Sequence, residues 1–151
     1  MEMIDYTGKL NNHKDYIKII EMLELKTKYI KIVVIDGKKT NHIVDKFKDD
    51  IIKTDKVSEW WGTITKIKNN LYKINASKEL FNYLREFETF TKYYPYGSNL
   101  KTHIRGEYSE LTDFGIDDIA FYDKKDICLL CTTTHEGYIM INEKIINMNK
   151  K

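Results

Sequence analysis

The stretch GIDDIAFYDKKDICLLCTTTHEGYIMIN, residues 115–142, holds the densest run of β-favouring residues in the chain. It divides into three short runs rich in β-branched, aromatic and other apolar residues, at 119–122, 127–134 and 138–142. Polar residues at 123–126 separate the first two runs, and a Glu136-Gly137 corner separates the last two. Because both connections are short, the stretch predicts three strands in an antiparallel meander.

The second run contains the two cysteines of the chain, Cys128 and Cys131, in a C-x-x-C arrangement. Residues three apart in a regular strand point to opposite faces, so we expect the two thiols not to converge on one metal ion. A zinc site would also need a second cysteine pair or a nearby histidine pair, and a thioredoxin-type motif would lie at a strand-to-helix turn. We interpret both cysteines as small buried hydrophobes and expect neither a metal nor a cofactor.

The first third of the chain predicts a helix, a strand and a second helix. The helix is expected over 11–25 because apolar residues recur there at helical spacing, at Tyr16, Ile19, Ile20 and Leu23. Residues 29–35, YIKIVVI, predict a buried strand that Asp36-Gly37 ends. A second, short helix is expected from residue 40 onward, on the spacing of Val44, Phe47 and Ile51.

A hairpin and the main helix are expected next. The runs 60–67 and 71–76 flank Asn69-Asn70, a pair that tolerates the left-handed conformation of tight turns. Ser77 is placed to cap a helix whose apolar stripe contains Leu80, Leu84 and Phe87. Residues 91–110 lack a sustained period and predict a long loop or an edge strand.

These elements together predict an α+β fold in one domain, residues 1–151. We expect a mostly antiparallel sheet, made of the hairpin and the C-terminal meander, with two to three helices packed on one face. A chain of 151 residues is long enough for one proper hydrophobic core and too short for two ordinary domains.

Net charge and hydropathy restrict the partners. With 25 Lys and Arg against 23 Asp and Glu, the net charge is only +2, so nucleic acid is not the expected partner. No apolar run reaches membrane-spanning length, and charged residues interrupt the first 25 positions. We therefore expect a cytoplasmic protein that does not enter a membrane.

An acidic window provides the strongest sequence signal for a binding surface. Between residues 105 and 126, seven acids and three bases give a charge of −4. Such a run is usually a solvated loop, but it could also select a basic protein partner. The residues assigned to that surface are the acids Glu107, Glu110, Asp113, Asp117 and Asp118 and the aromatic anchors Trp61, Tyr94 and Tyr96. On this hypothesis, reversing Asp117 and Asp118 to lysine slows association and leaves the fold intact.

Three functions remain open at this point. The leading hypothesis is a non-enzymatic binding protein or inhibitor, such as a bacterial toxin-immunity protein that neutralises a cationic effector; the Lys-, Ile- and Asn-rich composition is typical of AT-rich bacterial or phage genes. The alternative is a metal-independent ribonuclease that uses His103, Arg105, Glu107 and His135 as base, phosphate clamp and acid. Alternating polar residues are more commonly the solvated face of a strand, which favours the first hypothesis. A small regulatory or ligand-binding module is the third.

Overall fold

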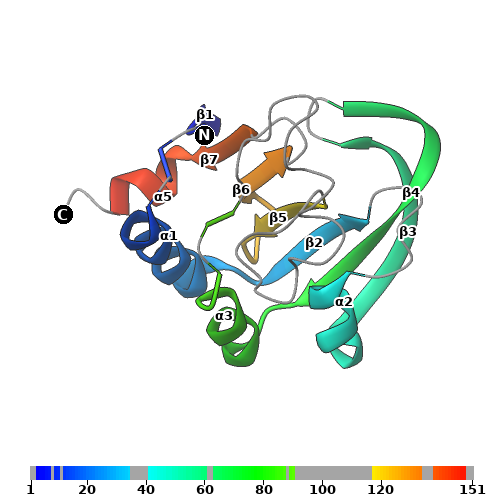
Figure 1. Ribbon diagram of the computed structural model, residues 1–151, viewed down its shortest axis with the longest axis horizontal. Helices are drawn as coiled ribbons and strands as arrows, with labels where there is room; N and C mark the ends of the chain where they lie inside the picture. Colours follow the sequence, from blue (N-terminus) through cyan, green and yellow to red (C-terminus); the bar gives the residue numbers. More distant parts are fainter. Residues whose placement is uncertain are drawn as a thin grey trace.

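The computed structural model describes residues 3–7, 9–10, 12–34, 41–60, 63–87, 89–90, 117–133 and 138–148. Its strands are β1 (Met3–Asp5), β2 (Tyr29–Val34), β3 (Ile51–Trp60), β4 (Thr63–Asn75), β5 (Asp118–Tyr122), β6 (Cys128–Thr133) and β7 (Tyr138–Asn142). Its helices are α1 (His13–Lys26), α2 (His42–Lys46), the 3-10 turn η1 (Lys48–Asp50), α3 (Lys78–Leu84) and α5 (Glu143–Met148). The strands form one antiparallel sheet in the order β1-β7-β6-β5-β2-β4-β3 (Figure 1). The α+β prediction is confirmed.

The predicted meander is present as β5, β6 and β7. Its last strand has the predicted bounds, and the first two differ from them by one or two residues. Ala120 lies opposite Cys131 on the neighbouring strand, and Cys131 lies opposite Met140 on the next. The chain turns between β5 and β6 at Asp126, whose φ of 64° is in the left-handed region that Asp tolerates better than most residues.

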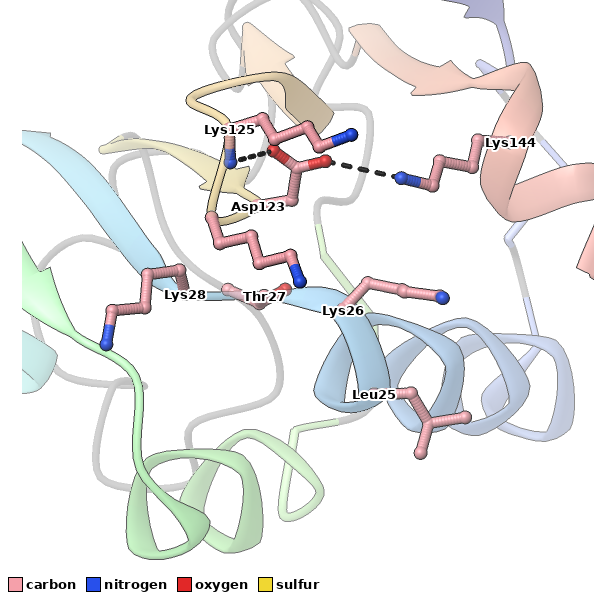
Figure 2. Close-up of a pocket in the computed structure, with 8 residues that line it drawn as sticks. Leu25, Lys26, Thr27, Lys28, Asp123, Lys125 and Lys144 are labelled. Carbon is pink, nitrogen blue, oxygen red and sulfur yellow. Dashed lines mark hydrogen bonds and ion pairs between the residues drawn. The ribbon is translucent and has the colours of Figure 1, made fainter.

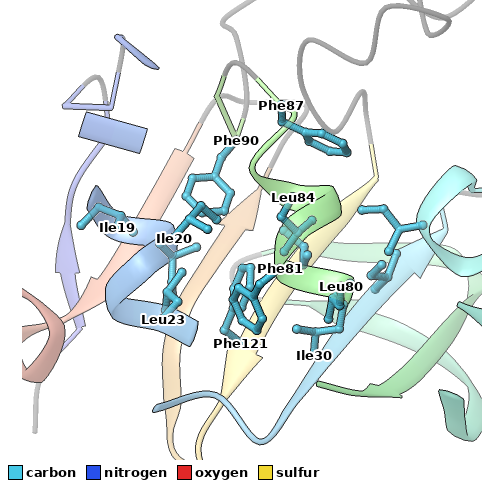
Figure 3. Close-up of a cluster of buried hydrophobic side chains, with 14 of the residues drawn as sticks. Ile19, Ile20, Leu23, Ile30, Leu80, Phe81, Leu84, Phe87, Phe90 and Phe121 are labelled. Carbon is cyan, nitrogen blue, oxygen red and sulfur yellow. The ribbon is translucent and has the colours of Figure 1, made fainter. Parts of the chain in front are cut away.

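The helices pack on one face of the sheet and bury the main hydrophobic core (Figure 3). Helix α1 begins where the side chain of Asn12 accepts a hydrogen bond from the N–H of Asp15 at 2.9 Å. It buries the four predicted residues, Tyr16, Ile19, Ile20 and Leu23. The Tyr16 hydroxyl donates to the carbonyl of Leu84 at 2.5 Å, which joins α1 to α3. Within the described residues, no helix is both long and apolar enough to span a membrane.

Helix α3 is capped as predicted, because Ser77 Oγ accepts from the N–H of Leu80 at 3.1 Å. It ends at Leu84, before the predicted stripe is complete. After Leu84 the chain tightens: the N–H groups of Glu86 and Phe87 donate to the carbonyls three residues back. Phe87 and Phe90 are still fully buried, so the apolar spacing correctly indicated burial but overestimated the length of the helix.

The prediction that Ile51 continues the second helix is wrong. Helix α2 has five residues, and Ile51 is the first residue of β3. Asn41 caps α2, with its side-chain oxygen accepting from the N–H groups of Ile43 and Val44. Val44 and Phe47, the other two residues of the predicted stripe, are buried in the main core.

A hairpin is present, but it is not the predicted one: its arms are β3 and β4, and most of the two predicted runs, 60–67 and 71–76, belongs to the single strand β4. Asn69 and Asn70 lie inside β4, opposite Val57 and Lys56 of β3, while Asn70 also pairs with Val34 of β2. Trp60 pairs with Thr63, so the chain reverses between these two residues. Hydrogen bonding from strands on both sides holds Asn70 extended and overrides the turn preference of an Asn-Asn pair.

A smaller apolar cluster lies on the face of the sheet opposite the helices. It contains Val33, Trp60, Leu71, Ala120, Cys128 and Cys131. The far end of the β3–β4 hairpin bends over the sheet (Figure 1), and Trp60 Nε1 donates to the carbonyl of Thr132 on β6 at 2.9 Å. The hairpin thus brings a tryptophan from the edge of the sheet to its centre.

Candidate functional site

Most residues that the sequence assigned to a site lie outside the described residues. These are the ribonuclease candidates His103, Arg105, Glu107 and His135, together with Glu110, Asp113, Trp61, Tyr94 and Tyr96. Their roles stay predictions. Two members of the acidic window, Asp117 and Asp118, are described.

Asp117 and Asp118 are buried, with 1% and 2% of their surfaces exposed, although the sequence placed them on an exposed strip. Asp117 Oδ2 accepts a hydrogen bond from Asn41 Nδ2 at 2.7 Å, which connects the cap of α2 to the start of β5. A buried carboxylate that makes such a bond organises the fold and presents little charge to a partner. The expectation that these two acids form an outer surface is therefore wrong.

The described residues instead form a basic hollow at one end of the sheet, which we call the lysine pocket (Figure 2). Its volume is about 400 Å³, within the range of ligand pockets. It is lined by Leu25, Lys26, Thr27, Lys28, Asp123, Lys124, Lys125 and Lys144. Five lysines and one aspartate give the lining a charge of +4, which is larger than the charge of +2 on the whole chain.

Three separate elements bring these lysines together. Lys26, Thr27 and Lys28 connect the end of α1 to β2, Lys124 and Lys125 belong to the β5–β6 turn, and Lys144 lies in the first turn of α5. The turn is joined to the α1–β2 connection by the N–H of Lys28, which donates to the carbonyl of Tyr122 at 2.7 Å. The pocket thus depends on the meander lying next to β2.

Asp123 is the one acid of the pocket, and its charge is already compensated within the protein. Its Oδ1 accepts from the N–H groups of Lys125 and Ile127 at 2.8 and 3.0 Å, and its Oδ2 lies 3.3 Å from Lys144 Nζ. Burial raises the pKa of Asp123, but the hydrogen bonds and the Lys144 ammonium outweigh burial and hold the pKa below its ordinary value of 3.8. Asp123 is therefore ionised at neutral pH, and both of its carboxylate oxygens already have hydrogen-bond partners within the protein.

Four exposed lysines remain around the pocket, at positions 26, 28, 124 and 125. In Figure 2 the ammonium groups of Lys26, Lys125 and Lys144 lie on one side of the pocket, whereas Lys28 extends to the other side. Like charges gathered around a hollow raise the local positive potential and attract anions. Each lysine ammonium is a single point of charge, whereas the planar guanidinium of arginine can hold one oxyanion with two parallel hydrogen bonds. The lysines therefore suit several separate negative groups better than one tightly held oxyanion.

Two further residues of the lining are uncharged. The Thr27 hydroxyl is buried and has no hydrogen-bond partner among the described residues. An unsatisfied buried hydroxyl costs about 1–3 kcal/mol of stability. Leu25 is 75% exposed at the pocket rim, where it offers an apolar contact.

Sequence reasoning missed this pocket although its signals were present. The signals are two short clusters, Lys26-Thr27-Lys28 and Lys124-Lys125. The second cluster lies inside the acidic window, where the surrounding acids made the summed charge negative. In the folded chain Asp117, Asp118 and Asp123 are buried, while Lys124, Lys125 and Asp126 are exposed, so the exposed charges at the described end of that window sum to +1.

Replacement of Asp123 by alanine is expected to cost about 1–3 kcal/mol at neutral pH, because two backbone N–H groups and Lys144 lose their acceptor. A folded-state pKa below 3.8 means that this stabilisation is fully present above pH 3.8 and is lost as the pH falls below it. Denaturant midpoints of both proteins at a series of pH values should therefore converge in acid.

The control for this prediction is Asp55→Ala, which removes an exposed ion pair with Lys53. Exposed pairs contribute at most about 1 kcal/mol, so this change should be nearly silent at every pH. An Asp123→Ala protein that loses the same small amount at all pH values would contradict the role given to Asp123.

Comparison with models of protein families, with curated proteins and with solved structures finds no match for this chain. Among the described residues, no three His, Cys, Asp or Glu side chains gather as they would around a metal ion. The lysine pocket is therefore the candidate binding site within the described residues.

Proposed function

We propose that this chain is a non-enzymatic binding protein whose lysine pocket docks an acidic segment of a protein partner. The observation that supports the proposal is the cluster of four exposed lysines around a hollow whose single acid is internally compensated. The protein partner predicted from sequence is retained, but the charge of the surface that receives it is reversed.

A protein segment fits the pocket better than a single phosphate group does. The lysines lie on both sides of the hollow rather than converging on one point (Figure 2). A chain of aspartates and glutamates could satisfy them in succession, and an apolar residue of the same segment could cover the exposed Leu25. Nucleic acid is disfavoured because the whole chain carries a charge of only +2.

The inhibitor hypothesis drawn from the acidic window is weakened in its described part. Of the five acids it assigned to the partner surface, Asp117 and Asp118 are buried, and the other three lie outside the described residues. The lysine pocket would repel a cationic effector and attract an anionic one. A partner with an acid-rich segment is the consistent choice.

The proposal predicts that a labelled glutamate-rich peptide with one central leucine binds the protein, and that added salt weakens binding. Replacing both Lys26 and Lys125 by glutamate should reduce affinity about tenfold or more, since each exposed ion pair contributes about 0.2–1 kcal/mol and is turned into a repulsion. Fluorescence anisotropy titration measures the effect.

The matched control replaces Lys48 and Lys56, which are exposed and do not line the pocket, by glutamate. Both double variants change the net charge by the same amount, so a difference between them reports position and not total charge. Equal loss of binding in the two would overturn the proposal. So would preference for single-stranded RNA or for inorganic phosphate over the peptide.

A further inference from the structure

Sulfur-bearing side chains gather on the face of the sheet opposite the helices. Cys128 and Cys131 are part of the smaller apolar cluster, and Met3 and Met140 pack against it. We call these four residues the sulfur cluster. They come from β1, β6 and β7 and include both cysteines of the chain and two of its five methionines.

An irregularity in β6 places the two cysteines on the same face. Leu130 pairs with Phe121, but the next pair joins Cys128 to Tyr122, so Leu129 is an extra residue in β6. Such a bulge shifts the alternation of side chains by one position. Leu129 joins the helix-side core, while Cys128 and Cys131 both reach the opposite cluster. The sequence-based expectation that residues three apart face opposite ways is therefore wrong here.

Cys128 and Cys131 belong to the same buried cluster, and the Cys128 side chain influences the pKa of Cys131. A hydrogen bond between their side chains is the largest cause that raises the pKa of Cys131, followed by burial and the nearby charges of Cys128 and Asp118. Cys128 Sγ donates a hydrogen bond to the carbonyl of Leu130 at 3.6 Å. Cys131 is 1% exposed and Cys128 is 8% exposed.

Thioether sulfur lies next to this thiol pair. Met140 is directly opposite Cys131 across the β6–β7 pair, which places the two side chains on one face at close range. Met3 pairs with Asn142, two residues along β7 from Met140, and so shares the same face. The cluster therefore combines two thiols with two thioethers in an apolar setting.

We propose that the sulfur cluster binds one monovalent soft metal ion of the Cu(I) type. Cys and Met ligands together select such ions over harder ones. Binding releases one proton to solvent: the Cys131 S–H bond breaks, a sulfur–metal bond forms, and the charges of the thiolate and the ion cancel. The thioethers of Met140 and Met3 then act as neutral donors, whereas Cys128 keeps its proton and does not coordinate the ion, because only a thiolate binds metal. A neutral complex suits a buried, largely apolar cluster, because an uncompensated buried charge is costly.

Zinc is a poor fit for this cluster. Protein zinc sites take cysteine, histidine and carboxylate ligands, usually four of them, and do not rely on thioethers. Among the described residues, no group of three or more such side chains gathers here or elsewhere. Zn²⁺ therefore serves as the contrasting probe.

The test is titration of the reduced full chain with Ag(I), a redox-inert probe of the same chemistry, followed by calorimetry and by counting of reactive thiols. One Ag(I) per chain should bind, and Zn²⁺ should not. Cys131→Ser should weaken binding at least 10- to 100-fold, because losing even an outer partner of a metal site has effects of that size. Met140→Leu should weaken binding about tenfold with little change in volume.

Met22→Leu is the matched control, because Met22 packs against the core on the opposite face. It should bind Ag(I) as the wild type does. If Cys131→Ser does not fold, the proposal is tested by comparing the Ag(I) affinity of Met140→Leu with that of Met22→Leu. The proposal is overturned if these two methionine variants bind equally, if the wild type binds no Ag(I), or if Zn²⁺ binds as tightly.

Discussion

Leu84→Ala is expected to lower the free energy of unfolding by about 2–5 kcal/mol. Leu84 is fully buried in α3, within the core that α1 and α3 form against the sheet (Figure 3). Truncation removes apolar contacts and leaves a cavity that neighbouring Phe81, Phe87 and Phe121 can fill only in part, because their rings are held in edge and tilted contacts. Equilibrium denaturation with urea measures the change.

Lys78→Ala provides the control on the same helix, because Lys78 is exposed. It should move the unfolding free energy by no more than about 0.5 kcal/mol. If the Leu84→Ala midpoint moves as little as this, α3 does not pack on the sheet in the way described.

Asp117→Lys is expected to destabilise the fold by about 3–5 kcal/mol or to prevent folding. The side chain is 1% exposed and accepts a hydrogen bond from Asn41, so lysine would bury a charge and leave the Asn41 amide without its acceptor. This reverses the expectation from sequence, in which charge reversal at Asp117 and Asp118 left the fold intact. Thermal and chemical denaturation measure the change.

Asp49→Lys is the matched control, because Asp49 is exposed and the change in charge is the same. It should leave stability within about 0.5 kcal/mol of the wild type. Equal stability of the two variants would show that Asp117 is accessible to solvent, and the acidic window would again be a candidate surface.

The spacing of apolar residues predicted most of the fold, because each helix or strand buries one face and that face sets the spacing. The α1 stripe and the meander depend on apolar residues that repeat at helical or strand spacing, and their packing follows that pattern. The errors arose where tertiary contacts override local preference. Asn70 is held extended by strands on both sides, and the bulge at Leu129 leaves no local signal in the sequence.

The candidate site was much less predictable than the fold. Its lysines come from three segments that are far apart in sequence and meet only when β5 pairs with β2. Summing charge along the chain gave the acidic window, whereas burial removes Asp117, Asp118 and Asp123 from the surface. A linear charge count cannot distinguish acids that organise the interior from acids that face solvent.

The pairing of β1 with β7 has a consequence for how the protein is made. Met3 lies opposite Asn142, and the N–H of Ile139 donates to Thr7 Oγ1, 132 residues earlier in the chain, at 3.1 Å. On the ribosome, β1 is synthesised well before β7 and must wait for it before it can join the sheet. β1 therefore cannot help to nucleate folding during translation, and a nascent chain that stops before β7 leaves the edge of β6 open to other chains.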